Sequence, residues 1–264
     1  MRRRNVLGVE VCATDYAQAC EEIRLAAVER RSLAVTALAV HGVMTGALDP
    51  THRRRLNALD MVLPDGQPVR WALNGLYGEG LRDRVCGPSL MLHVCDMAAR
   101  RGLSVGFYGN KAPVLAELRR KLEARFPGLK VSLEMPSRFG RVGEAEQAEL
   151  AGRIAASGTD ILFVGLGCPR QEVWVYENRG RLDMPLLAVG AALDFHADRV
   201  PLAPAWMGRS GLEWAFRLWH EPRRLWRRYL LLNPLYLLML AGQKLGLRRA
   251  ALLPDGPVPF EGFA

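Results

Sequence analysis

The sequence contains few cysteines and no cysteine pair at metal-binding spacing. Its five cysteines, at positions 12, 20, 86, 95 and 168, form no C-x-x-C motif. Zinc sites of the common kind need such pairs, and disulfide frameworks use an even set at regular spacings. An odd and scattered set is typical of a protein of a reducing cytoplasm. The cysteine content thus argues against both a secreted disulfide scaffold and a cysteine-bound metal centre.

Long apolar runs are also missing. A membrane-spanning helix needs about 20 predominantly apolar residues. The nearest candidate, YLLLNPLYLLMLAG at 229–242, is short and is broken by Asn233-Pro234. The N-terminal MRRRNVLGVEVCATDY has arginines but lacks the apolar stretch of a signal peptide. We therefore expect a cytoplasmic chain without a spanning helix.

Lysine is scarce, although the chain of 264 residues is basic. Four of its 36 basic residues are lysine, and the net charge is +9. Residues 206–249 hold nine basic residues against two acidic ones, a net charge of +7, together with four of the six tryptophans. Such a segment is typical of an amphipathic element at an anionic membrane surface. A core-packing helix with a solvated basic face is the alternative; no known nucleic-acid motif is present.

Short apolar runs alternate with helical patterns over the first 200 residues. The runs are LAVTAL (33–38), LSVGFYG (103–109), KVSLEM (130–135), DILFVGLG (160–167) and PLLAVGAAL (185–193). Helical spacing of apolar residues covers 88–102, 112–128 and 144–158. Strands that are apolar on both faces suit a parallel sheet covered by helices. The pattern predicts an α/β fold, a Rossmann-like open and mostly parallel sheet flanked by helices.

The turn GLGCPRQE, residues 165–172, follows a strand but lacks the dinucleotide fingerprint. Arg170 stands where G-x-G-x-x-G requires glycine. Gly165 and Gly167 end the strand, and a helix that begins near Pro169 directs free N–H groups at a ligand, as in phosphate sites. Arg170 and Gln171 then lie in its first turn. A plain strand–helix turn with solvated side chains is the alternative.

Two further turns follow the same logic. GFYGNKAP, at 106–113, places Gly109 at a strand end and Lys111 where it can meet a phosphate. VGAALDFHAD, at 189–198, places Asp194 and His196 just after a strand. Ligands of open α/β sheets bind beyond the carboxyl ends of the strands, so both turns are candidate ligand contacts. Tight structural turns are the alternative.

Taken in order, these turns resemble the WecG/TagA/CpsF glycosyltransferases, which correspond to glycosyltransferase family 26. The resemblance extends over about residues 5–235. The segments that carry it are LPDGQPVRWA (63–72), RDRVCGPSLM (82–91), GFYGNK, GLGCPRQE, VGAALDF and APAWMGRSGLEWAFRLWHEPRR (203–224). The most specific of them are PRQE, and GLEW followed by EPRR.

The resemblance implies an inverting, metal-independent bacterial enzyme without cofactor. Such an enzyme transfers a sugar from a UDP-sugar donor to a polyprenyl-diphosphate-linked acceptor at the inner face of the cell membrane. The resemblance also implies that homo-oligomers are possible, although the sequence identifies no interface. Asp194 and Asp198 are four residues apart, so this pair is no D-x-D metal motif.

Residue roles follow from the same resemblance. Asp65 matches the proposed catalytic base, which takes the acceptor's proton, and Arg84 matches an arginine that stabilises the leaving diphosphate. The substrate-binding set comprises Thr36, Gly109, Lys111, Gly165, Gly167, Arg170, Gln171, Glu172, Asp194, Arg217 and Arg224. For Asp65 a simple Asp-Gly turn is the alternative, and for Arg84 a surface ion pair.

Three positions depart from the family pattern. Leu38 stands where an asparagine often follows Thr36, Ser89 where an acidic residue is frequent, and Leu202 where arginine is common. These departures affect the sugar and the acceptor more than the reaction class. They leave a catalytically silent, membrane-peripheral nucleotide-sugar-binding protein as the alternative function, and a nucleotide-dependent oxidoreductase as a weaker one. We expect a catalytic domain over 1–203, a basic membrane-associating appendage over 204–249 and a loose tail over 250–264.

Overall fold

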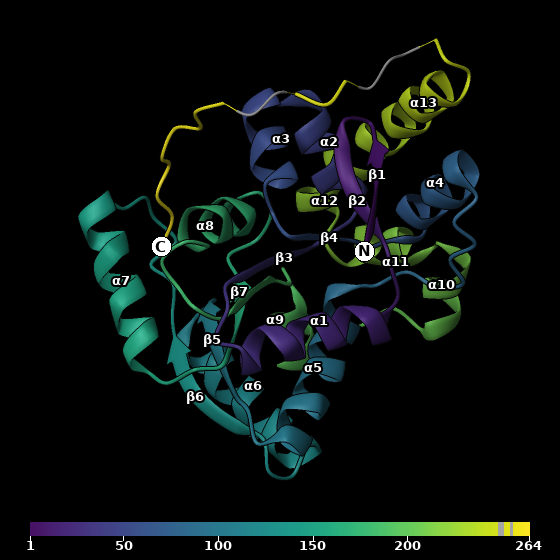
Figure 1. Cartoon of the computed structure of the whole chain (residues 1–264). Helices are drawn as coiled ribbons and strands as arrows, with labels where there is room; N and C mark the ends of the chain where they lie inside the picture. Colours follow the sequence, from purple (N-terminus) through teal and green to yellow (C-terminus); the bar gives the residue numbers. More distant parts are fainter. Residues whose placement is uncertain (248–250, 254–255) are drawn as a thin grey trace.

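The computed structural model describes residues 1–247, 251–253 and 256–264, and a six-stranded sheet forms the centre of this part (Figure 1). Across the sheet the strands are β4 (Met61–Pro64), β3 (Leu33–Leu38), β8 (Pro185–Ala188), β7 (Ile161–Gly165), β5 (Ser104–Gly109) and β6 (Lys130–Met135). All neighbouring strands run parallel. The predicted α/β fold is confirmed.

Helices cover both faces of the sheet. One face packs against α2 (Val40–Leu48), α3 (Pro50–Asn57), α4 (Gln67–Tyr77), α7 (Glu144–Ala156), α8 (Arg170–Asn178) and α13 (Leu232–Lys244). The other packs against α1 (Tyr16–Val28), α5 (Gly87–Arg101), α6 (Ala112–Arg125) and α9 (Ala192–His196). Strand side chains alternate between these layers: Leu162 and Val164 contribute to the first core, Ile161 and Phe163 to the second.

Three features of the structure differ from the prediction, the first being β4, which was not among the predicted strands. The predicted strand over 185–193 ends at Ala188, because Gly190 adopts a φ of 62° that breaks the extended backbone before α9. An antiparallel hairpin, β1 (Arg2–Val6) and β2 (Val9–Ala13), precedes the sheet and was not predicted. Its first strand, RRRNV, carries only one fully buried residue, Val6, so it lacks an apolar run.

The C-terminal helices lie over the carboxyl ends of the strands and are anchored in the core. They are α10 (Ala205–Ser210), α11 (Glu213–His220), α12 (Pro222–Leu230) and α13. Tyr236 and Met239 of α13 are buried, and the Tyr236 hydroxyl donates to the Pro68 carbonyl at 3.1 Å. Among the described helices, none is both long and apolar enough to cross a bilayer.

The last residues of the chain, where the sequence predicts a loose tail over 250–264, contact the α/β domain. Arg55, whose side chain is 1% exposed, donates to the Pro259 carbonyl at 2.8 Å and pairs with Glu261 at 2.6 Å. The Ala264 N–H donates to the Gly140 carbonyl at 3.1 Å, and the segment ends beside α7 and α8 (Figure 1). Residues 259–264 are therefore attached to the α/β domain by hydrogen bonds and an ion pair. Residues 248–250, at the predicted boundary between appendage and tail, lie outside the described residues.

The turn after β5 supplies a stability test. Gly109 has a φ of 115°, and a Cβ there would lie 2.6 Å from the Gly165 carbonyl oxygen, whereas Gly102 has a φ of 69° and no atom within 4 Å of such a Cβ. We expect Gly109→Ala to lower the free energy of unfolding by about 3 kcal/mol, through both strain and clash. Gly102→Ala should cost only about 1 kcal/mol. Urea unfolding of both variants measures the difference, and equal losses would contradict the clash at β5.

Candidate active site

A cavity of about 240 Å³ lies at the carboxyl ends of four strands. Its lining comes from the segments that follow β3, β4, β7 and β8, and from α11, α12 and α13 on the opposite side. This edge is where ligands of open parallel sheets bind, because the loops and helix N-termini converge there. The appendage therefore closes a site that the sheet begins.

Asp65 enters the cavity directly after β4. Its N–H donates to the Leu38 carbonyl at the end of β3, at 3.2 Å, so the neighbouring strand holds its backbone. Gly66 follows with a φ of 89°, which turns the chain away into α4. The Asp65 side chain remains 23% exposed, so its carboxylate is accessible from the cavity.

Arg84 lies between two carboxylates. Its Nη1 is 3.9 Å from Asp65 Oδ1, and its Nη2 donates to Glu213 Oε2 on α11. The Arg84 side chain is 15% exposed, and the next residue, Val85, donates its N–H to the Pro64 carbonyl at 3.0 Å. The arginine is thus held against β4 and at the same time contacts the appendage.

Burial and the neighbouring charged groups shift the pKa of the Asp65 carboxyl. The pKa of the Asp65 carboxyl is raised to about 6, chiefly by burial and also by the Glu213 carboxylate, while Arg84 and Arg217 oppose the shift. Above pH 6 the group is therefore ionised and accepts a proton. A carboxylate with a pKa near neutrality is suited to general base catalysis.

Arginines form the wall opposite the sheet, from α11 and α12. Arg217, Arg224 and Arg228 line the cavity. The Arg217 guanidinium lies 5.4 Å from the centroid of the Phe195 ring, and Arg224 pairs with Glu221 at 2.6 Å. The Nε atoms of Arg217 and Arg228 have no hydrogen-bond partner among the described residues. Such a wall suits a diphosphate, whose oxygens accept charge-assisted hydrogen bonds.

Gln171 and Glu172, at the start of α8, form the floor. Both are buried, and the Gln171 Nε2 donates to Glu172 Oε1 at 2.8 Å. Thr36 on β3 donates its hydroxyl to the same oxygen at 3.0 Å. Burial raises the pKa of Glu172. The floor is therefore a set of polar groups packed between β3 and α8.

The cavity brings together seven of the predicted site residues: Asp65, Arg84, Gly167, Gln171, Glu172, Arg217 and Arg224. Thr36 is fully buried behind Glu172 and is not part of the lining. Gly165 is likewise absent from the lining, because its Cα packs against Leu193. Substrate contact by Thr36 and Gly165 remains a prediction without support from this geometry.

The remaining predicted residues lie beside the cavity. The Asn110 Nδ2 donates to Asp194 at 2.8 Å, which joins the turns that follow β5 and β8. The Asn110 side-chain oxygen accepts from the Lys111 N–H at 2.9 Å. Gly109 is the last residue of β5, directly before the first of these turns. Arg170 is exposed, with its guanidinium 5.8 Å from the Phe263 ring. None of these four predicted residues lines the cavity.

Sequence reasoning missed several lining residues, among them His41 and Glu213. Burial, with Arg228 and His52, lowers the pKa of His41 to about 4, so the ring is neutral; the sequence offered no signal for it. Glu213 lies within the GLEW motif that carried the resemblance, but no role was assigned to it.

Among the described residues, no group of three His, Cys, Asp or Glu side chains is arranged to hold a metal ion.

Comparison with known proteins decides the family. The model of the "Glycosyl transferase WecG/TagA/CpsF family" matches residues 4–250. The chain belongs to this family. It is therefore a glycosyltransferase, as the resemblance implied, and the oxidoreductase alternative is wrong.

Two relatives are N-acetylglucosaminyldiphosphoundecaprenol N-acetyl-beta-D-mannosaminyltransferases. The one from Bacillus spizizenii is 32% identical over 183 residues, which cover 69% of this chain and 68% of the relative. The one from Bacillus subtilis is 27% identical over 190 residues, which cover 72% of each.

The charge arrangement around Asp65 predicts the pH dependence of this WecG/TagA/CpsF enzyme. If Asp65 is the base, kcat/KM falls by about tenfold per unit below pH 6, because the protonated carboxyl cannot accept a proton. Glu213→Gln removes a carboxylate that raises the pKa of Asp65, so the acid limb should move to lower pH. Glu221→Gln, a control on the same appendage, should leave the limb in place. An unmoved limb in Glu213→Gln would contradict the coupling.

Proposed function

We propose that the protein is an inverting, metal-independent glycosyltransferase that moves a sugar from a UDP-sugar to a polyprenyl-diphosphate-linked saccharide in bacterial surface polysaccharide biosynthesis. The observation that carries the proposal is Asp65, a carboxylate with a pKa near 6 that faces a cavity with an arginine wall. Both relatives are named as N-acetylmannosaminyltransferases of N-acetylglucosaminyldiphosphoundecaprenol. We therefore infer an N-acetylmannosamine donor and an acceptor of that kind.

The chemistry is a single displacement. The acceptor hydroxyl oxygen attacks the anomeric carbon while Asp65 takes its proton, and the bond from that carbon to the UDP oxygen breaks with its electron pair. Attack opposite the leaving group inverts the anomeric centre. The charge that develops on the leaving UDP requires cations, and Arg84, Arg217 and Arg228 line the same cavity. We assign the neutralising role of a metal to these guanidinium groups.

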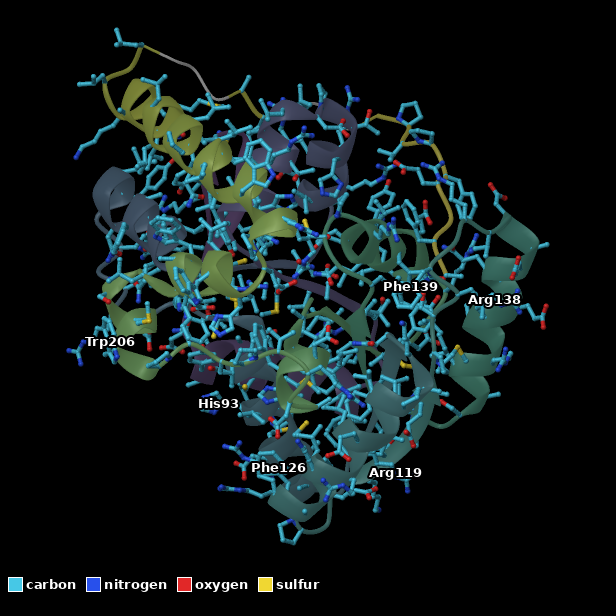
Figure 2. The ribbon with its side chains drawn as sticks, turned by 180° about the vertical axis from the view of Figure 1, so that it is seen from behind. His93, Arg119, Phe126, Arg138, Phe139 and Trp206 are labelled. Atoms are coloured by element: carbon cyan, nitrogen blue, oxygen red, sulfur yellow. The ribbon has the colours of Figure 1, made fainter. Side chains whose placement is uncertain are left out.

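The appendage supports peripheral attachment to the inner face of the membrane. Trp219 is 85% exposed, and Trp206 extends from α10 at the molecular surface (Figure 2). The other large apolar side chains exposed on α11, α12 and α13 are Trp214, Trp226, Leu230, Leu237 and Leu238. Exposed Arg223 and Arg227 accompany them on α12. Tryptophan and leucine at the acyl boundary, with arginine at anionic headgroups, form a typical interfacial surface.

A catalytically silent protein that binds nucleotide sugars remains the second candidate. It is favoured by Leu38, a buried apolar residue that lines the cavity where the family often has asparagine. Such a protein would bind UDP-sugars through the arginine wall and would transfer nothing.

Asp65→Asn separates the two functions. If Asp65 is the base, the variant should lose about 10²- to 10⁴-fold in kcat, since the amide cannot accept the proton. Its affinity for UDP should persist, because the arginines are untouched. Transfer from UDP-N-acetylmannosamine and UDP binding by calorimetry measure the two effects. A variant as active as the wild type would disprove the base, and a wild type that binds UDP but transfers no sugar would support the silent protein.

Membrane attachment is tested by charge removal on α12. Each arginine near an anionic surface contributes about 1 kcal/mol, so Arg223→Gln with Arg227→Gln should weaken binding to phosphatidylglycerol vesicles about 30-fold. Arg119→Gln with Arg120→Gln removes the same charge from α6, and Figure 2 shows Arg119 well away from Trp206. This control should sediment like the wild type. Equal losses in both double variants would indicate non-specific attraction by net charge.

A further inference from the structure

The side-chain amide of Gln171 has one satisfied end and one unsatisfied end. Its Nε2 donates to Glu172 Oε1, whereas its Oε1 has no partner among the described residues. The side chain is 3% exposed, lines the cavity and lies 3.7 Å from where a Cβ on Gly190 would stand. A buried amide oxygen without a partner costs free energy, so a ligand is its natural source of a donor.

The orientation of this amide follows from its neighbours. Glu172 Oε1 accepts from Gln171 and from the Thr36 hydroxyl, at 2.8 and 3.0 Å. Rotation of the Gln171 amide by 180° would bring its oxygen against the carboxylate oxygen and lose the bond. A proton on Glu172 Oε2, which is also unpartnered, leaves Oε1 able to accept both bonds. The orientation is therefore the same in either protonation state.

We propose that Thr36 and Glu172 are positioning residues that fix Gln171 as a hydrogen-bond acceptor, so that Gln171 recognises an N–H or O–H group of the sugar-nucleotide donor. The inference rests on the proposed function for the identity of the ligand. In this role Thr36 acts through Glu172 and does not contact the substrate, which agrees with its complete burial.

The cavity then has two chemically distinct sides. The floor offers the acceptor atom Gln171 Oε1, and the wall offers the guanidinium groups of α11 and α12. Phosphate oxygens are acceptors and cannot bond to Gln171 Oε1. The uncharged part of the donor, with its hydroxyl and amide hydrogens, therefore lies on the floor, and its diphosphate lies towards the wall.

An exchange of the two side chains tests the acceptor role. Gln171→Glu alone sets a second carboxylate against Glu172 and removes the bond between them, so the KM for UDP-N-acetylmannosamine should rise about tenfold. The double variant Q171E/E172Q restores a bonded pair with an acceptor at position 171, so its KM should return to within about threefold of wild type.

A double variant with a KM as high as that of Q171E would overturn the proposal. A carboxylate has no hydrogen to donate, so this result would show that Gln171 donates to the ligand. If the wild type itself neither binds UDP nor transfers sugar, the proposed function fails instead, which distinguishes the two failures.

Thr36 variants keep the test independent of the exchange. Thr36→Val removes the hydroxyl at nearly constant volume and should raise the donor KM about fivefold, while Thr36→Ser should restore most of the wild-type KM. Thr159→Val removes another buried hydroxyl, at the amino end of β7, and serves as the control for lost buried hydrogen bonds. A KM unchanged in Thr36→Val, or raised equally in Thr159→Val, would contradict a positioning role.

Discussion

The guanidinium of Arg84, held between Asp65 and Glu213, is the interaction on which the site depends. Without it, two carboxylates from distant parts of the chain would face one cavity without the cation that contacts both, which would favour protonation of one of them. With it, the edge of the sheet and the first turn of α11 share one cation. The position of the appendage and the proton affinity of Asp65 are therefore physically coupled.

The same coupling explains why the site lies between two structural units. The sheet supplies groups with fixed positions, because Asp65 follows β4, which is paired with β3, and Gln171 follows β7, which is paired with both β5 and β8. The appendage supplies charge, and its helices are anchored by a few buried residues, such as Leu225, Tyr236 and Met239. A catalytic base benefits from the rigid support, whereas arginines that meet a lipid-linked diphosphate benefit from lying next to the apolar surface of α11 to α13.

Most of the sheet could be predicted from the sequence, and much of the site could not. Strands such as β3 and β7 are apolar on both faces and end at turns, so local pattern identified them. The hairpin β1–β2 was missed because its arginine-rich strand has no apolar run. Lys111 and Arg170 were predicted at the ligand from their places in the turns that follow strands, but side-chain direction depends on tertiary contacts, such as that of Arg170 with Phe263. The contact between Arg84 and Glu213 spans 129 residues and leaves no local signal.

The most direct test is sugar transfer in the presence of EDTA. The purified protein is given UDP-N-acetylmannosamine and an N-acetylglucosaminyl-diphosphoryl polyprenol, and the linkage of the product is determined by NMR. The account predicts release of UDP and a product with inverted anomeric configuration, at a rate that EDTA does not reduce. Transfer that stops with EDTA and returns with magnesium or manganese, or a product that retains the donor's configuration, would contradict it.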